Sequence, residues 1–110
     1  MRNPPSLRSG RDFRRVLAEG RRVARNGLVA SALASRRPED PSRLGLAVRC
    51  SSAVARNRVK RRLRAAFVQV GPVGGYDVVV QADGSLLDME FSNLVKDLRI
   101  ALDRVTGGEQ

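Results

Sequence analysis

The 110-residue sequence contains no histidine, no tryptophan and a single cysteine, Cys50. The absence of histidine excludes a His-dependent catalytic triad and the His-containing zinc sites. One cysteine cannot form an intrachain disulfide, which fits a reducing, cytoplasmic compartment. No apolar run approaches the roughly 20 residues of a membrane span, and residues 1–10 lack the apolar core of a secretory signal. With only 4% aromatic residues for interfacial anchoring, we expect no membrane association.

Acidic residues are scarce in the first two-thirds of the chain. Residues 1–66 contain eighteen Arg and Lys against four Asp and Glu, a balance of +14, whereas residues 67–110 carry −4 and the whole chain +10. Nineteen of the twenty-one cations are Arg, which binds phosphate bidentately and stacks on bases. This distribution predicts a nucleic acid as the main partner, bound through charge steering and counterion release.

The most basic segment also has the pattern of a helix. Six of the nine residues from Arg56 to Arg64 are cationic. Apolar residues recur at spacings of three and four, which predicts one buried stripe on a helix over residues 53–70 with Ser52 as N-cap: Val59, Leu63, Ala66, Phe67 and Val70. Cations near a helix N-terminus are disfavoured by the helix dipole. A segment that accepts this cost is expected to serve function, here as a rigid array of guanidinium groups.

The remaining elements follow from periodicity and turn residues. We predict a first helix from Ser9 (N-cap) to about Glu19, closed by Gly20, and a last helix from N-cap Asp88 to Gly107-Gly108. Strands are predicted over residues 23–34, 43–49 and 76–82. Turns are predicted at 36–41 and 83–84, and a connector at 71–75. Asp77 is expected to be a turn residue. Arg21-Arg22 and Arg36-Arg37 are either peripheral phosphate contacts or solvated loop residues. Residues 1–110 then form one α+β domain, an α/β sandwich, with a basic arm at 1–8 and a frayed tail at 106–110.

Four sequence blocks resemble those of the bacterial ribonuclease P protein subunit. The signature is Arg56-Asn57-Arg58-Val59-Lys60-Arg61 followed by Arg64 and Phe67. It is flanked, in the family's order, by Asp12-Phe13-Arg14-Arg15-Val16-Leu17 with Gly20, by Arg43-Leu44-Gly45-Leu46-Ala47-Val48, and by Tyr76-Asp77-Val78-Val79-Val80. The resemblance spans roughly residues 7–105.

This resemblance implies both a fold and a function. The fold would be ribosomal-S5-domain-2-like, a single mixed sheet with a left-handed βαβ crossover through the basic helix; the pattern alone would favour a right-handed one. The chain would be a subunit of an endoribonuclease that matures the 5′ end of tRNA. A large RNA would perform the cleavage with Mg²⁺ at its own active site. The protein would bind that RNA and the 5′ leader of precursor tRNA.

The resemblance also assigns roles to residues. Those expected to contact the catalytic RNA are Arg56, Asn57, Arg58, Arg61 and Arg62. Those expected at the leader cleft, between the first helix and the sheet, are Phe13, Leu17, Ser31, Lys60 and Arg64. From the residues alone, Phe13 could equally be core, and Lys60 and Arg64 could extend over the core. We predict no catalytic residue, no metal ligand and no cofactor held by the protein itself.

Two departures from the family pattern affect these expectations. Arg49-Cys50-Ser51-Ser52 is shorter than the Lys-rich, Gly-containing loop usual before the signature helix. Leu17 and Ser31 stand where relatives often carry aromatic rings, each of which contributes about 1–3 kcal/mol by stacking on a base. We therefore predict a leader contact that is mainly electrostatic.

Three other functions would use the same composition. A ribosomal or other structural RNA-binding protein would share the basic helix without needing a leader cleft. A stand-alone nuclease would need general acid and base groups, and the absence of His and of paired carboxylates argues against it. A DNA-binding module is disfavoured because no helix-turn-helix spacing is present.

Overall fold

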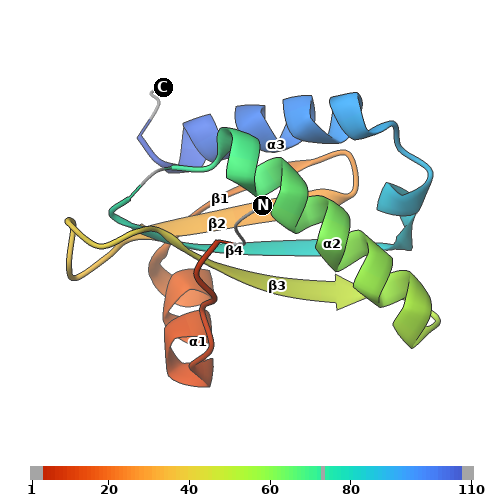
Figure 1. The fold of residues 1–110 in the computed structure, drawn as a ribbon. Helices are drawn as coiled ribbons and strands as arrows, with labels where there is room; N and C mark the ends of the chain where they lie inside the picture. Colours follow the sequence, from red (N-terminus) through yellow and green to blue (C-terminus); the bar gives the residue numbers. More distant parts are fainter. Residues whose placement is uncertain (1–3, 73, 108–110) are drawn as a thin grey trace.

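A computed structural model describes residues 4–72 and 74–107 of the chain. A four-stranded sheet in the order β1-β2-β4-β3 carries α1 on one face and α2 and α3 on the other (Figure 1). The elements are α1 (Gly10–Glu19), β1 (Arg21–Arg25), β2 (Leu28–Ala34), β3 (Arg43–Arg49), α2 (Ala53–Val70), β4 (Tyr76–Asp83), the 3-10 helix η1 (Gly84–Leu87) and α3 (Phe91–Val105). The predicted single mixed sheet of an α+β sandwich is confirmed.

The sheet combines both strand orientations. β2 pairs antiparallel with β1 and with β4, whereas β3 pairs parallel with β4. The parallel pair is connected through α2, so the basic helix is the crossover of a βαβ unit. The left hand of this crossover stays a prediction of the resemblance.

Two hydrophobic clusters lie on the two faces of the sheet. The larger one packs α2 and α3 onto the strands, and its helical members are Val59, Leu63, Ala66, Phe67, Leu94, Leu98, Ala101, Leu102 and Val105. The smaller one, under α1, contains Leu7, Val16 and Val79, with Phe13 and Leu33 packed against it. The apolar stripe predicted for the basic helix is therefore its buried face, with Val70 half-buried.

The single strand predicted over residues 23–34 is wrong, because the chain reverses at Asn26-Gly27. Both residues have positive φ, 44° and 88°, as a two-residue hairpin turn of type I′ requires. Asp97 of α3 holds this hairpin: it accepts hydrogen bonds from Arg25 Nε at 2.8 Å and Asn26 Nδ2 at 3.1 Å. The Asn26-Gly27 pair is a typical hairpin turn sequence. The turn was missed because the apolar run that follows it was read as the continuation of one long strand.

The helix ends agree with the sequence at Ser9, Gly20 and Ser52 and differ at Asp88. Ser9 and Ser52 are N-caps, accepting from the amides of Asp12 at 3.4 Å and Ala55 at 3.1 Å. Asp88 is not the N-cap of α3: it ends η1, and Glu90 precedes α3 without a side-chain bond. Gly20 follows α1 in an extended conformation, and its role is spatial, since a Cβ there would lie 2.6 Å from the Val16 carbonyl oxygen.

The expected basic arm is partly built into the fold. The Leu7 amide donates to the Leu44 carbonyl at 3.0 Å, and the Leu44 amide donates to the Pro5 carbonyl at 2.8 Å. This segment thus extends the sheet beside the start of β3, and the prediction of a free arm is wrong for residues 5–7. At the other end, the Thr106 carbonyl accepts from the Tyr76 hydroxyl at 2.9 Å, so fraying does not begin at residue 106. Residues 1–3 and 108–110 lie outside the described residues.

Candidate RNA interface

The cations of α2 divide between two flanks and an outer face. With Val59 and Leu63 buried, helical geometry directs Arg58 and Arg62 toward η1 and α3. Arg56, Lys60 and Arg64 fall on the opposite flank, and all three are half-buried. Asn57 and Arg61 are exposed between the two flanks. The residues predicted to bind the catalytic RNA therefore surround most of the solvent-facing side of the helix.

Arg62 differs from its neighbours because its side chain is bound within the protein. Its Nη2 donates to the carbonyl oxygen of Met89, and its guanidinium carbon lies 5.9 Å from the centroid of the Phe91 ring. Its Nε is buried and has no hydrogen-bond partner among the described residues. Arg62 thus joins α2 to the segment before α3. Together with Arg58 and Arg61 it lines a hollow of about 440 Å³ whose other walls include Leu87 and Phe91.

The predicted cleft residues on the α1 side have three different environments. Phe13 is half-buried, and its ring lies over Gly45 of β3, where a Cβ would be 2.6 Å from Phe13 Cε2. Leu17, one turn later, is 38% exposed. Ser31 is only 1% exposed, and its hydroxyl has no hydrogen-bond partner among the described residues. Phe13 therefore belongs to the core and Leu17 to the surface, while Ser31 does not reach solvent.

The structure does not bring all five predicted cleft residues together. α1 and α2 lie on opposite faces of the sheet, so β3, an edge strand, separates Phe13 and Leu17 from Lys60 and Arg64 (Figure 1). The first pair lies at the α1 face and the second pair lies on α2. A single strand that contacts both pairs has to pass around the β3 edge.

A groove lined by none of the predicted cleft residues lies on the α1 face of the sheet. Its floor is the register row Val29, Gln81 and Ala47, from β2, β4 and β3. The hollow has a volume of about 440 Å³, and its remaining lining residues are Gly27, Val48, Arg49, Ala82 and Asp83. Gln81 Oε1 is buried there and accepts no hydrogen bond from the described residues. The alternation of side chains along β3 and β4 indicated that Ala47 and Gln81 share a face of the sheet. Val29 could be placed beside Gln81 only once the β1–β2 hairpin was known.

One carboxylate borders this groove. The hydroxyl of Ser85 donates to Asp83 Oδ1, as does the Ser85 amide at 2.9 Å. These bonds hold the pKa of the Asp83 carboxyl below its usual value. The groove thus contains one anion opposite the cationic Arg49.

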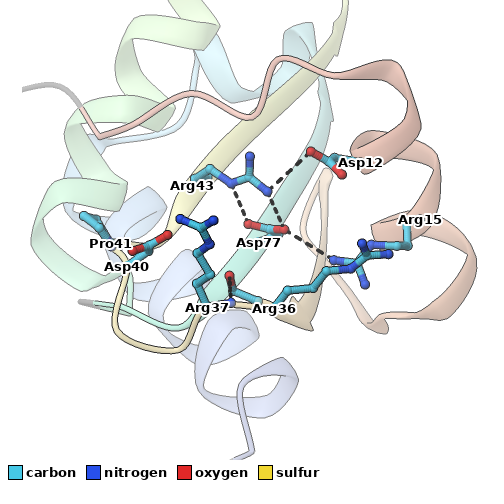
Figure 2. Close-up of a pocket in the computed structure, with 9 residues that line it drawn as sticks. Asp12, Arg15, Arg36, Arg37, Asp40, Pro41, Arg43 and Asp77 are labelled. Atoms are coloured by element: carbon cyan, nitrogen blue, oxygen red, sulfur yellow. Dashed lines mark hydrogen bonds and ion pairs between the residues drawn. The ribbon is translucent and has the colours of Figure 1, made fainter.

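A second hollow, of about 350 Å³, lies at the other end of the sheet, next to α1 (Figure 2). Arg43 binds Asp77 bidentately, with Nε to Oδ1 at 2.9 Å and Nη2 to Oδ2 at 2.8 Å. Arg15 lies 3.6 Å from the same carboxylate, and Arg43 also reaches Asp12 at 3.4 Å. The hydrogen bond to Asp77 raises the pKa of Arg43. Asp77 is therefore a buried ion-pair residue in β4, and its predicted role in a turn is wrong.

The described residues contain neither a cluster of metal-binding side chains nor a membrane-spanning helix. Within residues 4–72 and 74–107, no group of three or more His, Cys, Asp and Glu side chains is arranged to hold a metal ion. Over the same ranges, no helix is long and apolar enough to cross a membrane.

Comparison with known proteins identifies the family. The sequence model of the ribonuclease P family matches residues 1–106. The ribonuclease P protein component of Gluconacetobacter diazotrophicus is 38% identical over 110 residues, covering 94% of each chain. The corresponding protein of Streptococcus mutans is 34% identical over 101 residues, covering 89% of this chain and 83% of the relative.

Solved structures agree with the sequence relatives. The RNase P protein of Thermotoga maritima superposes with a TM-score of 0.78 at 30% identity, covering 93% of this chain and 98% of that one. The RNase P protein of Staphylococcus aureus gives a TM-score of 0.75 at 28% identity, covering 89% and 92%. The match along almost the whole chain, in sequence and in fold, places this chain in the bacterial ribonuclease P protein family.

Proposed function

We propose that this chain, as the protein subunit of ribonuclease P, binds the RNase P RNA through the solvent-facing side of α2. The observation that carries this proposal is the set of cations on the two flanks and the outer face of that helix, with no acidic residue between Arg56 and Arg64. Arg56, Asn57, Arg58 and Arg61 would contact phosphates and sugars directly. Arg62 would keep α2 fixed against Met89 and Phe91, and so hold the cations of α2 in place.

The 5′ leader of precursor tRNA is the second proposed ligand. Its single strand would enter the groove over Val29, Gln81 and Ala47, on the same face of the sheet as the helix α1 that carries Phe13 and Leu17, and then pass the β3 edge. Beyond that edge, Lys60 and Arg64 would neutralise its phosphates. Ser31 supports the face under α1, and direct contact with the leader would require α1 to move, because Ser31 is buried.

The chemistry of cleavage would belong to the RNA. Phosphodiester hydrolysis needs groups that activate water and stabilise the leaving oxygen, which Mg²⁺ bound to RNA supplies. The protein would contribute by screening the repulsion between two polyanions, which raises substrate affinity and metal occupancy at the RNA site. We also expect the chain to act in the cytoplasm, which imaging of a fluorescent fusion would test.

Cleavage of a 5′-extended precursor tRNA at near-physiological magnesium tests this proposal. The arms are the protein alone, a bacterial RNase P RNA alone, and the two together. A fourth arm uses the Arg56→Ala/Arg58→Ala double variant, and a matched control carries Arg99→Ala/Arg104→Ala on the exposed side of α3. Cleavage that requires RNA and protein, and that falls only with the first variant, supports the assignment.

The other outcomes point to other functions. Cleavage by the protein alone would indicate a stand-alone nuclease. Equal binding of precursor and mature tRNA by the assembled enzyme would contradict the leader groove and favour a general RNA-binding protein. Equal losses in both double variants would mean that only overall charge matters.

A further inference from the structure

We propose that the hollow lined by Arg15, Arg36 and Arg37 binds one phosphodiester group of RNA. This site lies at the opposite end of the sheet from the groove over Gln81. Gln81 follows Asp77 by four positions in β4, a distance of about 13 Å along a strand. The site is also distinct from α2, which lies on the other face (Figure 1). This proposal rests on the proposed function in one respect, since it takes the phosphate to come from an RNA that the protein binds.

Arg43 and Arg15 together balance the two carboxylates at the floor of the hollow. Asp77 is 1% exposed and receives two hydrogen bonds from Arg43, and Arg43 also pairs with Asp12. A carboxylate so satisfied does not repel an incoming anion as an unpaired one would. Arg43 and Asp77 thus act as supports for the cations around them.

Arg15 retains hydrogen-bonding capacity in this arrangement. Its Nη2 lies 3.6 Å from Asp77 Oδ2, a distance too long for a hydrogen bond. A guanidinium group has five N–H donors in a planar fork, which suits the oxygens of a phosphate. Since α1 holds Arg15 over the buried Asp77, the guanidinium is positioned before any ligand arrives.

The loop between β2 and β3 supplies the other two cations. Arg36 and Arg37 are exposed, and no ion pair links either of them to another described residue within 4.0 Å. Figure 2 shows the Arg36 side chain extending toward Arg15. The Arg37 amide donates to Ser35 Oγ at 3.1 Å, which fixes the backbone at this point. Since Arg36 has no ion-pair partner of its own among the described residues, an anion bound beside it and Arg15 would reduce the repulsion between the two guanidinium groups.

The charges of the whole hollow favour a singly charged ligand. Its lining contains four arginines and three aspartates, with Asp40 at the exposed rim. After the two inner aspartates are paired, Arg36 and Arg37 exceed Asp40 by one positive charge. A phosphodiester carries one negative charge and fits easily in about 350 Å³. The phosphodiester is also the anion that nucleic-acid-binding proteins contact most often.

The first test uses inorganic phosphate and NMR of the arginine side chains. We expect saturable shifts of the Arg15 Nε–H signal on titration of the free protein, at a constant chloride concentration at which circular dichroism shows that the protein is fully folded. They should vanish in Arg36→Ala/Arg37→Ala and persist in the matched control Arg21→Ala/Arg22→Ala, which removes two exposed cations from β1. Linear, unsaturated shifts, or the same loss in both variants, would mean general charge screening and overturn the site.

The second test asks which RNA supplies the phosphate. Affinities are measured for RNase P RNA alone, and then for precursor and mature tRNA by the assembled enzyme. We expect Arg36→Ala/Arg37→Ala to weaken the affinity for one of these RNAs about tenfold relative to the control, because two arginine contacts to the bound phosphate are lost. A loss with RNase P RNA assigns the phosphate to the catalytic RNA, and a loss only with tRNA assigns it to the substrate. Equal affinities of both variants for all three RNAs overturn the proposal, whatever the outcome of the Arg56/Arg58 experiment.

Discussion

Arg43 and Asp77 face each other across the parallel pair β3–β4 and form a bidentate ion pair in which the carboxylate is 1% exposed. The same guanidinium reaches Asp12 in the first turns of α1. One side chain therefore joins the edge strand, the central strand and the first helix. This contact fixes α1 over one end of the sheet and leaves the row Val29, Gln81 and Ala47 uncovered at the other end.

Removal of Arg43 should destabilise the protein strongly. Arg43→Ala leaves a buried carboxylate that accepts no hydrogen bond from the described residues and has only Arg15, 3.6 Å away, as counter-charge, so we expect a loss of about 3 kcal/mol in the free energy of unfolding. The double variant Arg43→Met/Asp77→Leu should lose less, because it leaves no buried charge. Urea denaturation followed by circular dichroism measures both. A cost below about 1 kcal/mol for the single variant would show that the buried pair is not needed.

Substitution of Arg61 should weaken RNA binding without loss of stability, whereas substitution of Arg62 should reduce the stability of the protein. Arg62→Ala removes the bond to Met89 and the contact with Phe91, and should cost about 2 kcal/mol of stability. Arg61→Ala should change stability by less than about 0.5 kcal/mol, because Arg61 is exposed. It should nevertheless weaken RNase P RNA binding and reduce the salt slope by about one unit. Urea denaturation and filter binding at several salt concentrations give the two readouts. A larger loss of stability in Arg61→Ala than in Arg62→Ala, or a larger loss of salt slope in Arg62→Ala than in Arg61→Ala, would contradict the roles given to these two residues.

The leader's contribution to affinity should depend strongly on salt. It is the ratio of the dissociation constants of mature and precursor tRNA for the assembled enzyme. With Lys60 and Arg64 as phosphate contacts, the logarithm of this ratio should fall against log salt with a slope of about −1.4. Arg64→Ala should reduce the slope by about 0.7, whereas Arg104→Ala should not change it. A ratio nearly independent of salt would exclude a mainly electrostatic grip.

Asp83 should oppose leader binding. Its folded-state pKa lies below the unfolded value, so its hydrogen bonds stabilise the fold above about pH 3.9 and are lost as pH falls through the folded pKa. Ser85→Ala should raise the pKa of Asp83 toward its ordinary value in a carboxyl NMR titration. Asp83→Asn should improve the affinity ratio of precursor to mature tRNA by about two- to threefold, since one charge at the groove edge is removed. The exposed Asp103→Asn on α3 is the control, and an equal gain there would point to net charge alone.

The free protein should be only partly folded at low salt. Residues 1–66 carry a balance of +14, and their self-repulsion opposes the compact state until anions bind. Circular dichroism in low-salt buffer should therefore show reduced helix content that sulfate restores. A full signal without sulfate would contradict this expectation.

Much of the chain was determined by local sequence patterns. The bounds of β3 and α2 and the buried stripe of α2 follow from alternation, from the three-and-four spacing and from the Ser52 cap, all of which act over a few residues. The cationic face of α2 follows in the same way, because a helix with one buried stripe exposes its other residues. The candidate RNA interface was therefore readable from the sequence.

The tertiary structure alone decided which of these residues lie together. Arg62 lies over Phe91, Ser31 is buried, and Phe13 and Lys60 lie on opposite sides of the sheet, because packing between segments distant in sequence places them there. The Arg43–Asp77 pair and the Val29–Gln81–Ala47 floor depend on the strand order β1-β2-β4-β3, which no local pattern encodes. Local propensities set the elements, whereas the burial of apolar surface and the pairing of buried charges set their arrangement.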